Sequence, residues 1–319
     1  MDSTAAGTPN PAGTPAAAGG PDAAGGPNPA GTPVEAGGPN PAGRLPDFCV
    51  IGTAKSGTTT LYRWLDAQPE VRLPTLKEPN FFGREDRWAL GLDWYRSLFA
   101  GIPEDLRTGE ASVRYTAPEL AELAAARIAA VLGPRPLICL LRDPAERARS
   151  HYRHQVQRGR ERRPFPVAVA EPHNPYIAGS CYATVLRPYV RRFGERLAVV
   201  RFEDLLAGPG WEQVCTHLGL TPRPAPAGAH NVTAAKARFS GPARLAYRRR
   251  WHRLGGALGP LRRPLRRLLL RDDRRYRDLL ASAAAPLPAD AVALLAAELD
   301  ALGALLGRPV RWDGWDAGP

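Results

Sequence analysis

The stretch that decides the fold is Phe48-Cys49-Val50-Ile51-Gly52-Thr53-Ala54-Lys55-Ser56-Gly57-Thr58-Thr59-Thr60-Leu61. Four apolar residues lead into a glycine, a lysine follows, and a second glycine precedes three threonines, which is typical of a buried strand, a tight turn and a helix start. The first N–H groups of a helix lack intrahelical partners, and the helix dipole adds about half a positive charge there. We therefore expect an anion-binding loop, with Lys55 as a movable charge and Thr58 and Thr59 as hydroxyl donors.

The spacing of this loop differs from that of the NTPase P-loop. In G-x-x-x-x-G-K-[ST] the lysine follows the second glycine, and a hydroxyl for magnesium comes directly after it. Here Lys55 precedes Gly57. Taken alone, the stretch is also compatible with a chance Gly/Thr turn.

The first 43 of the 319 residues have a composition of their own. They contain no Lys or Arg and repeat Pro-Asn-Pro-Ala-Gly from Pro9, Pro27 and Pro39. Such a segment cannot bury enough apolar surface to offset chain entropy. We predict a disordered tail over 1–43 and one folded domain over 44–319. No signal peptide or run of about 20 apolar residues is evident, so we expect a cytoplasmic protein without a transmembrane segment.

The charge balance is strongly basic. The net charge is +12, and because the tail holds three of the 31 acidic residues and none of the 43 basic ones, residues 44–319 carry +15. This balance favours an anionic ligand or partner, although arginine-rich surfaces also arise from GC-rich coding. Only Lys55, Lys77 and Lys236 are lysines. The four cysteines form no C-x-x-C pair, so Cys49 and Cys139 are expected as buried small hydrophobes, with no metal site or disulfide framework.

A second informative stretch is Leu73-Pro74-Thr75-Leu76-Lys77-Glu78-Pro79-Asn80-Phe81-Phe82. The two prolines keep it extended. A carboxylate in a partly apolar setting beside a phosphate-type loop can take a proton from an acceptor hydroxyl or amine. Glu78 is thus a candidate general base, and a surface Lys–Glu pair is the alternative.

The third stretch runs from Pro136 to Tyr152. Its apolar run, 136–141, is typical of a central parallel strand that is covered on both faces. The strand ends in Arg142, and Asp143 with Pro144 starts a helix that carries Ser150 about two turns along. Arg142 and Ser150 can therefore bind the same phosphate group. The alternative is a capped helix with a surface arginine.

Between these stretches lies Thr108-Gly109-Glu110-Ala111-Ser112-Val113-Arg114-Tyr115, which has the pattern of a strand with polar residues at its end. Glu110 and Ser112 can line a cleft there, or they can cap the helix that follows Pro118. Helices are expected over 58–67, from Gly91, and over 118–131, 182–193, 211–218 and 290–306.

Five motifs follow one another in a fixed order: K-S-G-T-T, K-E-P-N-F-F, G-L-D-W-Y, G-E-A-S and L-L-R-D-P-x-E-R-x-x-S-x-Y. This series resembles the sulfotransferases that use 3′-phosphoadenosine 5′-phosphosulfate (PAPS), nearest to the branch of the heparan-sulfate N- and 3-O-sulfotransferases and their bacterial relatives. The likeness covers residues 48–220, with a weaker echo up to Trp312.

The resemblance implies roles for particular residues. Lys55, Ser56, Gly57, Thr58 and Thr59 would hold the 5′-phosphosulfate end of PAPS, and Lys55 would offset charge on the leaving phosphate. Arg142 and Ser150 would bind the 3′-phosphate, Glu78 would be the base, and no metal is needed. His230–Arg238 resembles the late loop that closes over the donor, in which Lys236 or Arg238 would touch a phosphate. Ala111 stands where the mammalian enzymes carry a lysine. The chain has no cysteine after Cys215, so neither their disulfide-closed loop nor its glycan-binding role is carried over to this chain.

The segment 244–277 holds 13 arginines interleaved with leucines and Trp251. It is either a basic surface for an anionic acceptor or for peripheral contact with membrane headgroups, or a set of helices packed on the domain with solvated arginine stems.

These observations predict an α/β fold with a P-loop-like parallel sheet, helices on both faces, and strands near 48–52, 107–110, 136–141 and 197–202. The expected reaction is sulfuryl transfer from PAPS to a hydroxyl or amine of a small-molecule or glycan acceptor, with no nucleic-acid partner. The alternatives are a small-molecule P-loop kinase, which requires magnesium, and an inactive polyanion-binding module on the same scaffold.

Overall fold

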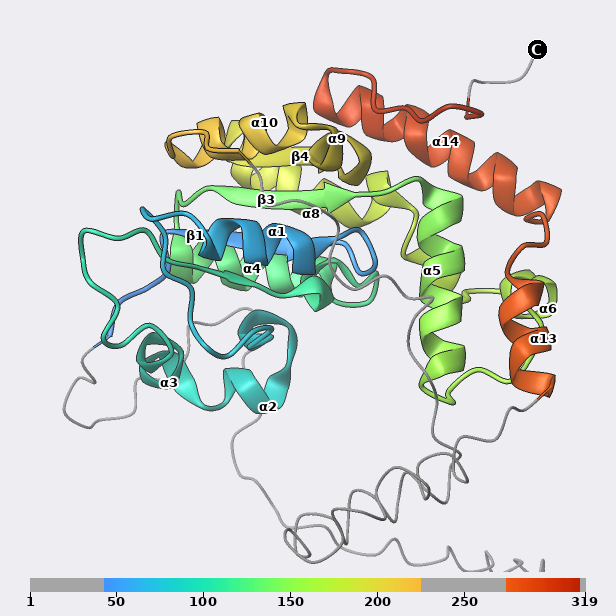
Figure 1. The fold of residues 1–319 in the computed structure, drawn as a ribbon, viewed down its shortest axis with the longest axis horizontal. Coiled ribbons are helices and arrows are strands. Elements are labelled where there is room, and N and C mark those ends of the chain that lie inside the picture. The colour runs from blue at the N-terminus through green and yellow to red at the C-terminus, as the bar shows by residue number, and fades with distance from the viewer. Residues whose placement is uncertain (1–42, 225–273, 316–319) are drawn as a thin grey trace, which may run out of the picture.

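The computed structural model describes residues 43–224 and 274–315 (Figure 1). A parallel sheet with the strand order β2-β1-β3-β4 forms its centre. Its strands are β1 Phe48–Gly52, β2 Gly109–Ala111, β3 Leu137–Leu141 and β4 Leu197–Arg201. The predicted strands and the predicted α/β class are confirmed. The predicted tail lies outside the described residues, except for Gly43.

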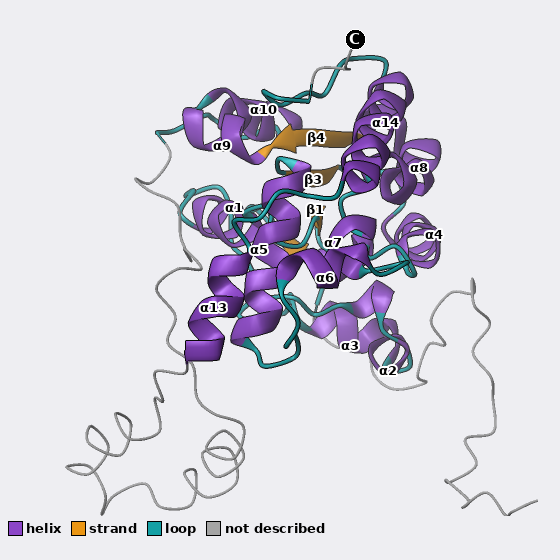
Figure 2. Ribbon diagram, turned by 90° about the vertical axis from the view of Figure 1, so that its right-hand side faces the viewer, coloured by secondary structure: helices purple, strands orange, loops and turns teal. Residues whose placement is uncertain are grey.

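Both faces of the sheet are covered, because successive side chains of a strand point to opposite faces. Val50, Ile138 and Leu140 belong to one buried cluster, and Cys49, Ile51 and Cys139 belong to the other. The first cluster is closed by α1 Thr58–Asp66, α9 Phe202–Ala207 and α10 Pro209–Leu218. The second is closed chiefly by α4 Ala121–Leu132, α8 Tyr182–Phe193 and α14 Ala289–Leu306. Figure 2 shows these two layers on either side of the strands.

The remaining helices lie at two corners of the sheet. One group begins with the helix that follows β3 and includes a helix near the C-terminus that packs beside it (Figures 1 and 2). These helices are α5 Pro144–Gln157, α6 Phe165–Ala170, α7 Pro175–Ala178 and α13 Arg274–Ser282. The other group consists of α2 Glu85–Trp88 and α3 Gly91–Ser97, which lie below β1 and α4 in the view of Figure 1. In the described ranges, no helix is both long and apolar enough to span a bilayer.

The longer helices begin and end close to where the sequence predicts them. The helices expected over 58–67, 182–193 and 290–306 are α1, α8 and α14, and those expected over 118–131 and 211–218 are α4 and α10. The short helices α2, α6, α7 and α9 were not predicted, because one or two turns give no clear periodicity. Cys49 and Cys139 are fully buried free thiols, as predicted.

Parallel strands end at one edge of the sheet, and the motifs meet there. The loop after β1 leads into α1, Arg142 and Asp143 after β3 lead into α5, and β4 runs directly into α9. This edge is where ligands of open α/β sheets bind.

Candidate phosphate-binding site

The loop after β1 has the geometry of an anion-binding turn. Gly57 is the N-cap of α1 and has the left-handed φ of 86°. A Cβ atom on Gly57 would lie 2.2 Å from ring carbons of Phe202, so only glycine fits here. The hydroxyls of Thr53 and Ser56 are 2.5 Å apart, and the Thr53 amide donates to the carbonyl of Leu140 at 2.7 Å. These hydrogen bonds attach the loop to β3, and the last residues of the loop lead into the N-terminus of α1.

Ser56 contributes to the loop from inside it. Its side chain is fully buried and bonded to Thr53. Its hydroxyl therefore shapes the turn, while the backbone N–H groups at the start of α1 remain the natural donors to an anion.

A buried arginine donates a hydrogen bond to the loop after β1. Arg147 on α5 is 1% exposed, and its guanidinium donates to the Ser180 hydroxyl at 2.6 Å and to the carbonyls of Ala54, at 3.4 Å, and Tyr176. All three acceptors are neutral oxygens. Burial lowers the pKa of Arg147 from its ordinary value, and its charge adds a positive field under the loop that carries Lys55.

The K-E-P stretch reaches the same helix start. The Lys77 ammonium donates to the Thr59 hydroxyl at 2.6 Å and lies 5.6 Å from the ring centroid of Tyr62. Burial lowers the pKa of Lys77, the adjacent Glu78 charge opposes that effect, and Arg63 adds to it. One residue of the second motif, Lys77, therefore contacts the first turn of α1.

Glu78 and Asn80 hold an uncommon backbone conformation. Their φ angles are 58° and 53°, in the left-handed region that costs a non-glycine residue about 1–2 kcal/mol. The side-chain amide of Asn80 donates to the carbonyl of Glu78 at 2.7 Å, and the Asn80 N–H donates to the Ser112 hydroxyl at 3.0 Å. The Glu78 side chain is partly buried.

Glu110 and Ser112 neither line a cleft nor cap the helix that follows Pro118. Both are buried, and the N-cap of α4 is Leu120, which has no side-chain cap bond. Ser112 instead bonds the Glu110 carboxylate at 2.9 Å. The two residues form an interior network behind the K-E-P stretch.

Arg142 lies between β3 and α5, and Ser150 lies on α5, as predicted. The Arg142 guanidinium is 5.8 Å from the ring centroid of Phe202 and 3.6 Å from the Glu146 carboxylate. Phe202 also packs against Gly57, so one aromatic ring contacts both the loop after β1 and Arg142. Ser150 is 6% exposed on α5.

Asp143 is the N-cap that the sequence predicts. Its Oδ1 accepts from the Glu146 N–H at 2.8 Å, and its Oδ2 accepts from the Trp315 indole N–H at 2.6 Å. A second indole, that of Trp312, donates to Glu203 at 2.7 Å. The segment after α14 is thereby fixed against the strand ends.

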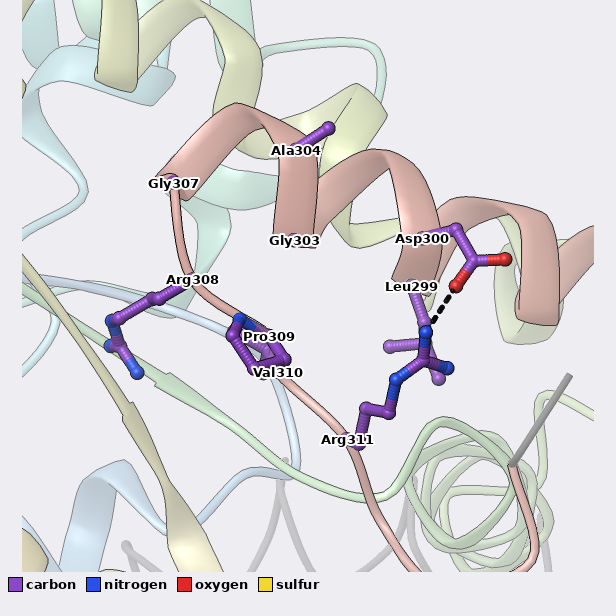
Figure 3. Close-up of a pocket in the computed structure, with 9 residues that line it drawn as sticks. All are labelled: Leu299, Asp300, Gly303, Ala304, Gly307, Arg308, Pro309, Val310 and Arg311. Carbon is purple, nitrogen blue, oxygen red and sulfur yellow. Dashed lines mark hydrogen bonds and ion pairs between the residues drawn. The ribbon is translucent and has the colours of Figure 1, made fainter.

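The other predicted donor residues, Lys236 and Arg238, lie outside the described residues, as does most of 244–277. A hollow of about 390 Å³ occurs at the C-terminal end of α14, where Arg311 pairs with Asp300 at 2.8 Å (Figure 3). None of the predicted site residues lines it. It lies between α14 and the segment 307–311 that follows it.

Three residues of this region were missed by sequence reasoning: Lys77 as a partner of Thr59, Phe202 as the ring on Gly57, and Arg147 under the loop. The lysine had a signal, because it is one of three in an arginine-rich chain. Arg147 also had one, because it is the second arginine of the L-L-R-D-P-x-E-R motif, but no role was assigned to it there. Phe202 had none, since a Phe after a strand looks like an ordinary packing residue.

Comparison with known proteins identifies the family of the chain. A family model described as a sulfotransferase domain matches residues 45–222, more than half of the chain. The chain therefore belongs to the sulfotransferase domain family. A sulfotransferase from Alicyclobacillus acidocaldarius has the same fold, with a TM-score of 0.58 and 23% identity over 85% of this chain and 99% of that one.

Among curated proteins, the chain is similar to enzymes of heparan sulfate. It is 37% identical over 120 residues to the human bifunctional heparan sulfate N-deacetylase/N-sulfotransferase 3, a match that covers 35% of this chain and 13% of that protein. It is 32% identical over 189 residues to the mouse heparan sulfate glucosamine 3-O-sulfotransferase 3A1, covering 56% and 46%. Each match spans less than half the length of the relative. The resemblance noted in the motifs is confirmed.

Proposed function

We propose that this protein transfers the sulfuryl group of PAPS to a hydroxyl or amine of an acceptor, with Glu78 as the general base. The contact between Lys77 and Thr59, at 2.6 Å, carries the proposal. It places Lys77, the neighbour of the candidate base Glu78, against Thr59 in the first turn of α1, where the backbone N–H groups can hold an anion. A base and an anion-binding turn side by side are what in-line transfer from a bound donor requires.

Each residue has a defined task in this proposal. PAPS supplies the sulfuryl group and a leaving bisphosphate. The amides of residues 57–59 and the Lys55 ammonium stabilise negative charge that builds on the departing 5′-phosphate. Arg142 and Ser150 hold the 3′-phosphate, and the resemblance of 230–238 to the late loop of the family adds Lys236 or Arg238 as a contact to a phosphate. Glu78 removes the proton of the acceptor hydroxyl or amine.

The residues present fit such a donor. The helix start carries N–H donors, Arg147 adds positive charge beneath the loop through its bond to Ala54, and Arg142 lies beside the same Phe202 ring that packs on Gly57. Two phosphate-type groups at the ends of one nucleotide require two cationic sites of this kind. The site needs no metal for this chemistry.

The kinase alternative is weaker on one specific observation. A P-loop kinase binds magnesium through a strand-end aspartate. The candidate here is Asp143, and its two oxygens accept hydrogen bonds from the Glu146 amide and the Trp315 indole. The carboxylate is engaged in holding α5 and the C-terminal segment, so it is poorly placed to bind an ion.

The acceptor is proposed by class. Two similar proteins are named as heparan sulfate N- and 3-O-sulfotransferases, and the net charge of +15 outside the tail favours an acidic acceptor. A glycan or a small molecule with an accessible amine or hydroxyl is therefore the proposed substrate class. A cytoplasmic location remains a prediction from the sequence.

The test is transfer of radiolabelled sulfuryl from PAPS to a panel of amino- and hydroxyl-bearing glycans and small molecules. We expect labelled product with the wild-type protein. Glu78→Gln should lose at least about 100-fold in transfer rate, the usual range for a general base, and should still bind adenosine 3′,5′-bisphosphate. A Glu78→Gln variant with undiminished transfer would remove Glu78 from the mechanism.

A further inference from the structure

The carboxylate of Glu110, in the short strand β2, is buried and takes no part in the proposed reaction. Among the residues that the structure describes, it has no ion-pair partner within hydrogen-bond distance. It is 1% exposed. Its Oε1 accepts from the hydroxyls of Tyr95, at 3.0 Å, and Tyr115, at 2.8 Å, and its Oε2 accepts from Ser112 at 2.9 Å. Burying a carboxylate costs free energy unless its oxygens accept hydrogen bonds in this way. These three hydrogen bonds therefore stabilise the buried carboxylate.

This network continues to the backbone of the proposed base. The Ser112 hydroxyl donates its single proton to Glu110, and its oxygen accepts the Asn80 N–H at 3.0 Å. Asn80 in turn donates its side-chain amide to the carbonyl of Glu78 at 2.7 Å. Three consecutive hydrogen bonds therefore lead from the buried carboxylate to the residue that carries the base.

The same tyrosines hold the segment just after the base. The ring of Phe81 stacks on Tyr95 with centroids 4.5 Å apart and an angle of 8° between the planes. Phe82 packs against Tyr115 at 5.6 Å, and its N–H donates to the Tyr115 hydroxyl at 3.4 Å. The partners of Glu110 thus fix the segment on the far side of Asn80.

The local backbone needs such support. Glu78 and Asn80 are both left-handed, and glutamate has no special tolerance for this conformation, whereas asparagine has some. A strained turn persists only where its surroundings hold it. The bond from the Asn80 N–H to Ser112 is the fixed point of this turn.

We propose that Glu110 is a positioning residue that orients Ser112, holds the Asn80 backbone through it, and so fixes the place of the Glu78 carboxylate. The inference rests on the proposed role of Glu78. Ionised Glu110 offers only acceptors, so the Ser112 proton must point toward it and the Ser112 oxygen is left to accept from Asn80. A neutral amide in its place can turn an N–H₂ donor toward Ser112 and remove that direction.

Protonation of Glu110 should have the same effect as its replacement by a neutral amide, because in both cases the direction of the Ser112 hydroxyl is no longer fixed. Burial raises the pKa of Glu110 to about 7, against the hydrogen bonds of its partners, which favour the ionised form. The titratable and polar groups that face it come from β1, α1, α3 and the turn after β2: Cys49, Tyr62, Tyr95, Ser112 and Tyr115. The turn formed by Glu78 and Asn80 should therefore be held most firmly above pH 7, where Glu110 is ionised.

The experiment compares Glu110→Gln and Ser112→Ala with Tyr189→Phe as matched control. Tyr189 is also a buried tyrosine, but its hydroxyl bonds the Tyr115 carbonyl and has no contact with Glu110 or Asn80. The first measurement is amide hydrogen exchange at Asn80 by NMR. All variants are compared at one pH and at one temperature, which lies below the midpoint of thermal unfolding of each of them. We expect exchange at least about 10-fold faster in both test variants, and unchanged in the control.

The second measurement is the rate of sulfuryl transfer. We expect kcat to fall roughly 10- to 100-fold in Glu110→Gln and Ser112→Ala, because small displacements of a catalytic group cost that much. KM for PAPS should stay within about 3-fold, and the double variant should lose no more than either single one. The wild-type kcat should fall as pH drops through 7, beyond the change seen in Glu110→Gln.

The outcomes separate the two proposals. Unchanged Asn80 exchange and kcat in both variants would overturn the positioning role, and equal loss in Tyr189→Phe would reduce it to general packing. If wild-type protein transfers no sulfuryl from PAPS, the proposed function fails, while Asn80 exchange still decides whether Glu110 holds the turn. If Ser112→Ala does not fold, Glu110→Gln carries both measurements.

Discussion

The buried carboxylate of Glu110 makes folding stability depend on pH with an unusual sign. Its pKa is about 7 in the folded protein, against an ordinary value of 4.5. Between these values the folded state binds more protons than the unfolded state, so the free energy of unfolding falls as pH rises. Most folded-state carboxylates act in the opposite direction.

The magnitude follows from these two pKa values. Each pH unit in this window costs up to about 1.4 kcal/mol, so the contribution of Glu110 should fall by about 3 kcal/mol in all between pH 4.5 and somewhat above 7. Glu110→Gln removes the titration. The difference in unfolding free energy, wild type minus Glu110→Gln, should therefore fall by about this amount and then level off.

The assay is urea unfolding followed by tryptophan fluorescence from pH 5 to pH 8.5. Glu122→Gln is the control, because hydrogen bonds from Arg192 and Arg191 lower the pKa of that exposed carboxyl. Its difference curve should show no fall in this range. A wild-type minus Glu110→Gln difference that stays flat, or rises with pH, would refute the claim that the Glu110 carboxyl is held unfavourably ionised at neutral pH.

Two further predictions concern the loop. Gly57→Ala places a methyl group 2.2 Å from the Phe202 ring at a φ of 86°, so the free energy of unfolding should drop by about 2–4 kcal/mol, measured by urea unfolding; a loss below 1 kcal/mol would contradict this. Lys77→Met keeps the aliphatic stem but removes the charge beside Thr59; sulfuryl transfer should slow by roughly 10-fold or more with bisphosphate affinity within about 3-fold, whereas an equal loss of both would assign Lys77 to donor binding instead.

Much of this fold could be predicted because its central strands are continuous apolar runs. Phe48–Ile51 and Leu137–Leu141 are buried on both faces, and that environment tolerates few polar residues. The Asp143 cap and Pro144 at the first helical position likewise signal α5 in sequence alone. Local chemistry determines these features, so the sequence displays them.

The contacts that complete the site depend on distant parts of the chain. Whether Glu110 faces solvent, a helix end or the interior is decided by Tyr95 and Tyr115, which no local pattern around Glu110 identifies. The ring of Phe202 reaches Gly57 only because β4 lies two strands from β1. Lys77 meets Thr59 across a loop with no periodicity. Such pairings are tertiary, and sequence spacing does not encode them.

The central claim is that the loop after β1 and the Arg142 corner bind the two ends of one nucleotide. Isothermal titration with adenosine 3′,5′-bisphosphate, beside ATP with magnesium, tests it most directly, repeated with Arg142→Ala and Lys55→Ala. The account predicts binding of the bisphosphate without magnesium and a roughly 10- to 100-fold loss in Arg142→Ala, the usual value of a charge-assisted hydrogen bond. No binding, or a preference for ATP with magnesium, would contradict it.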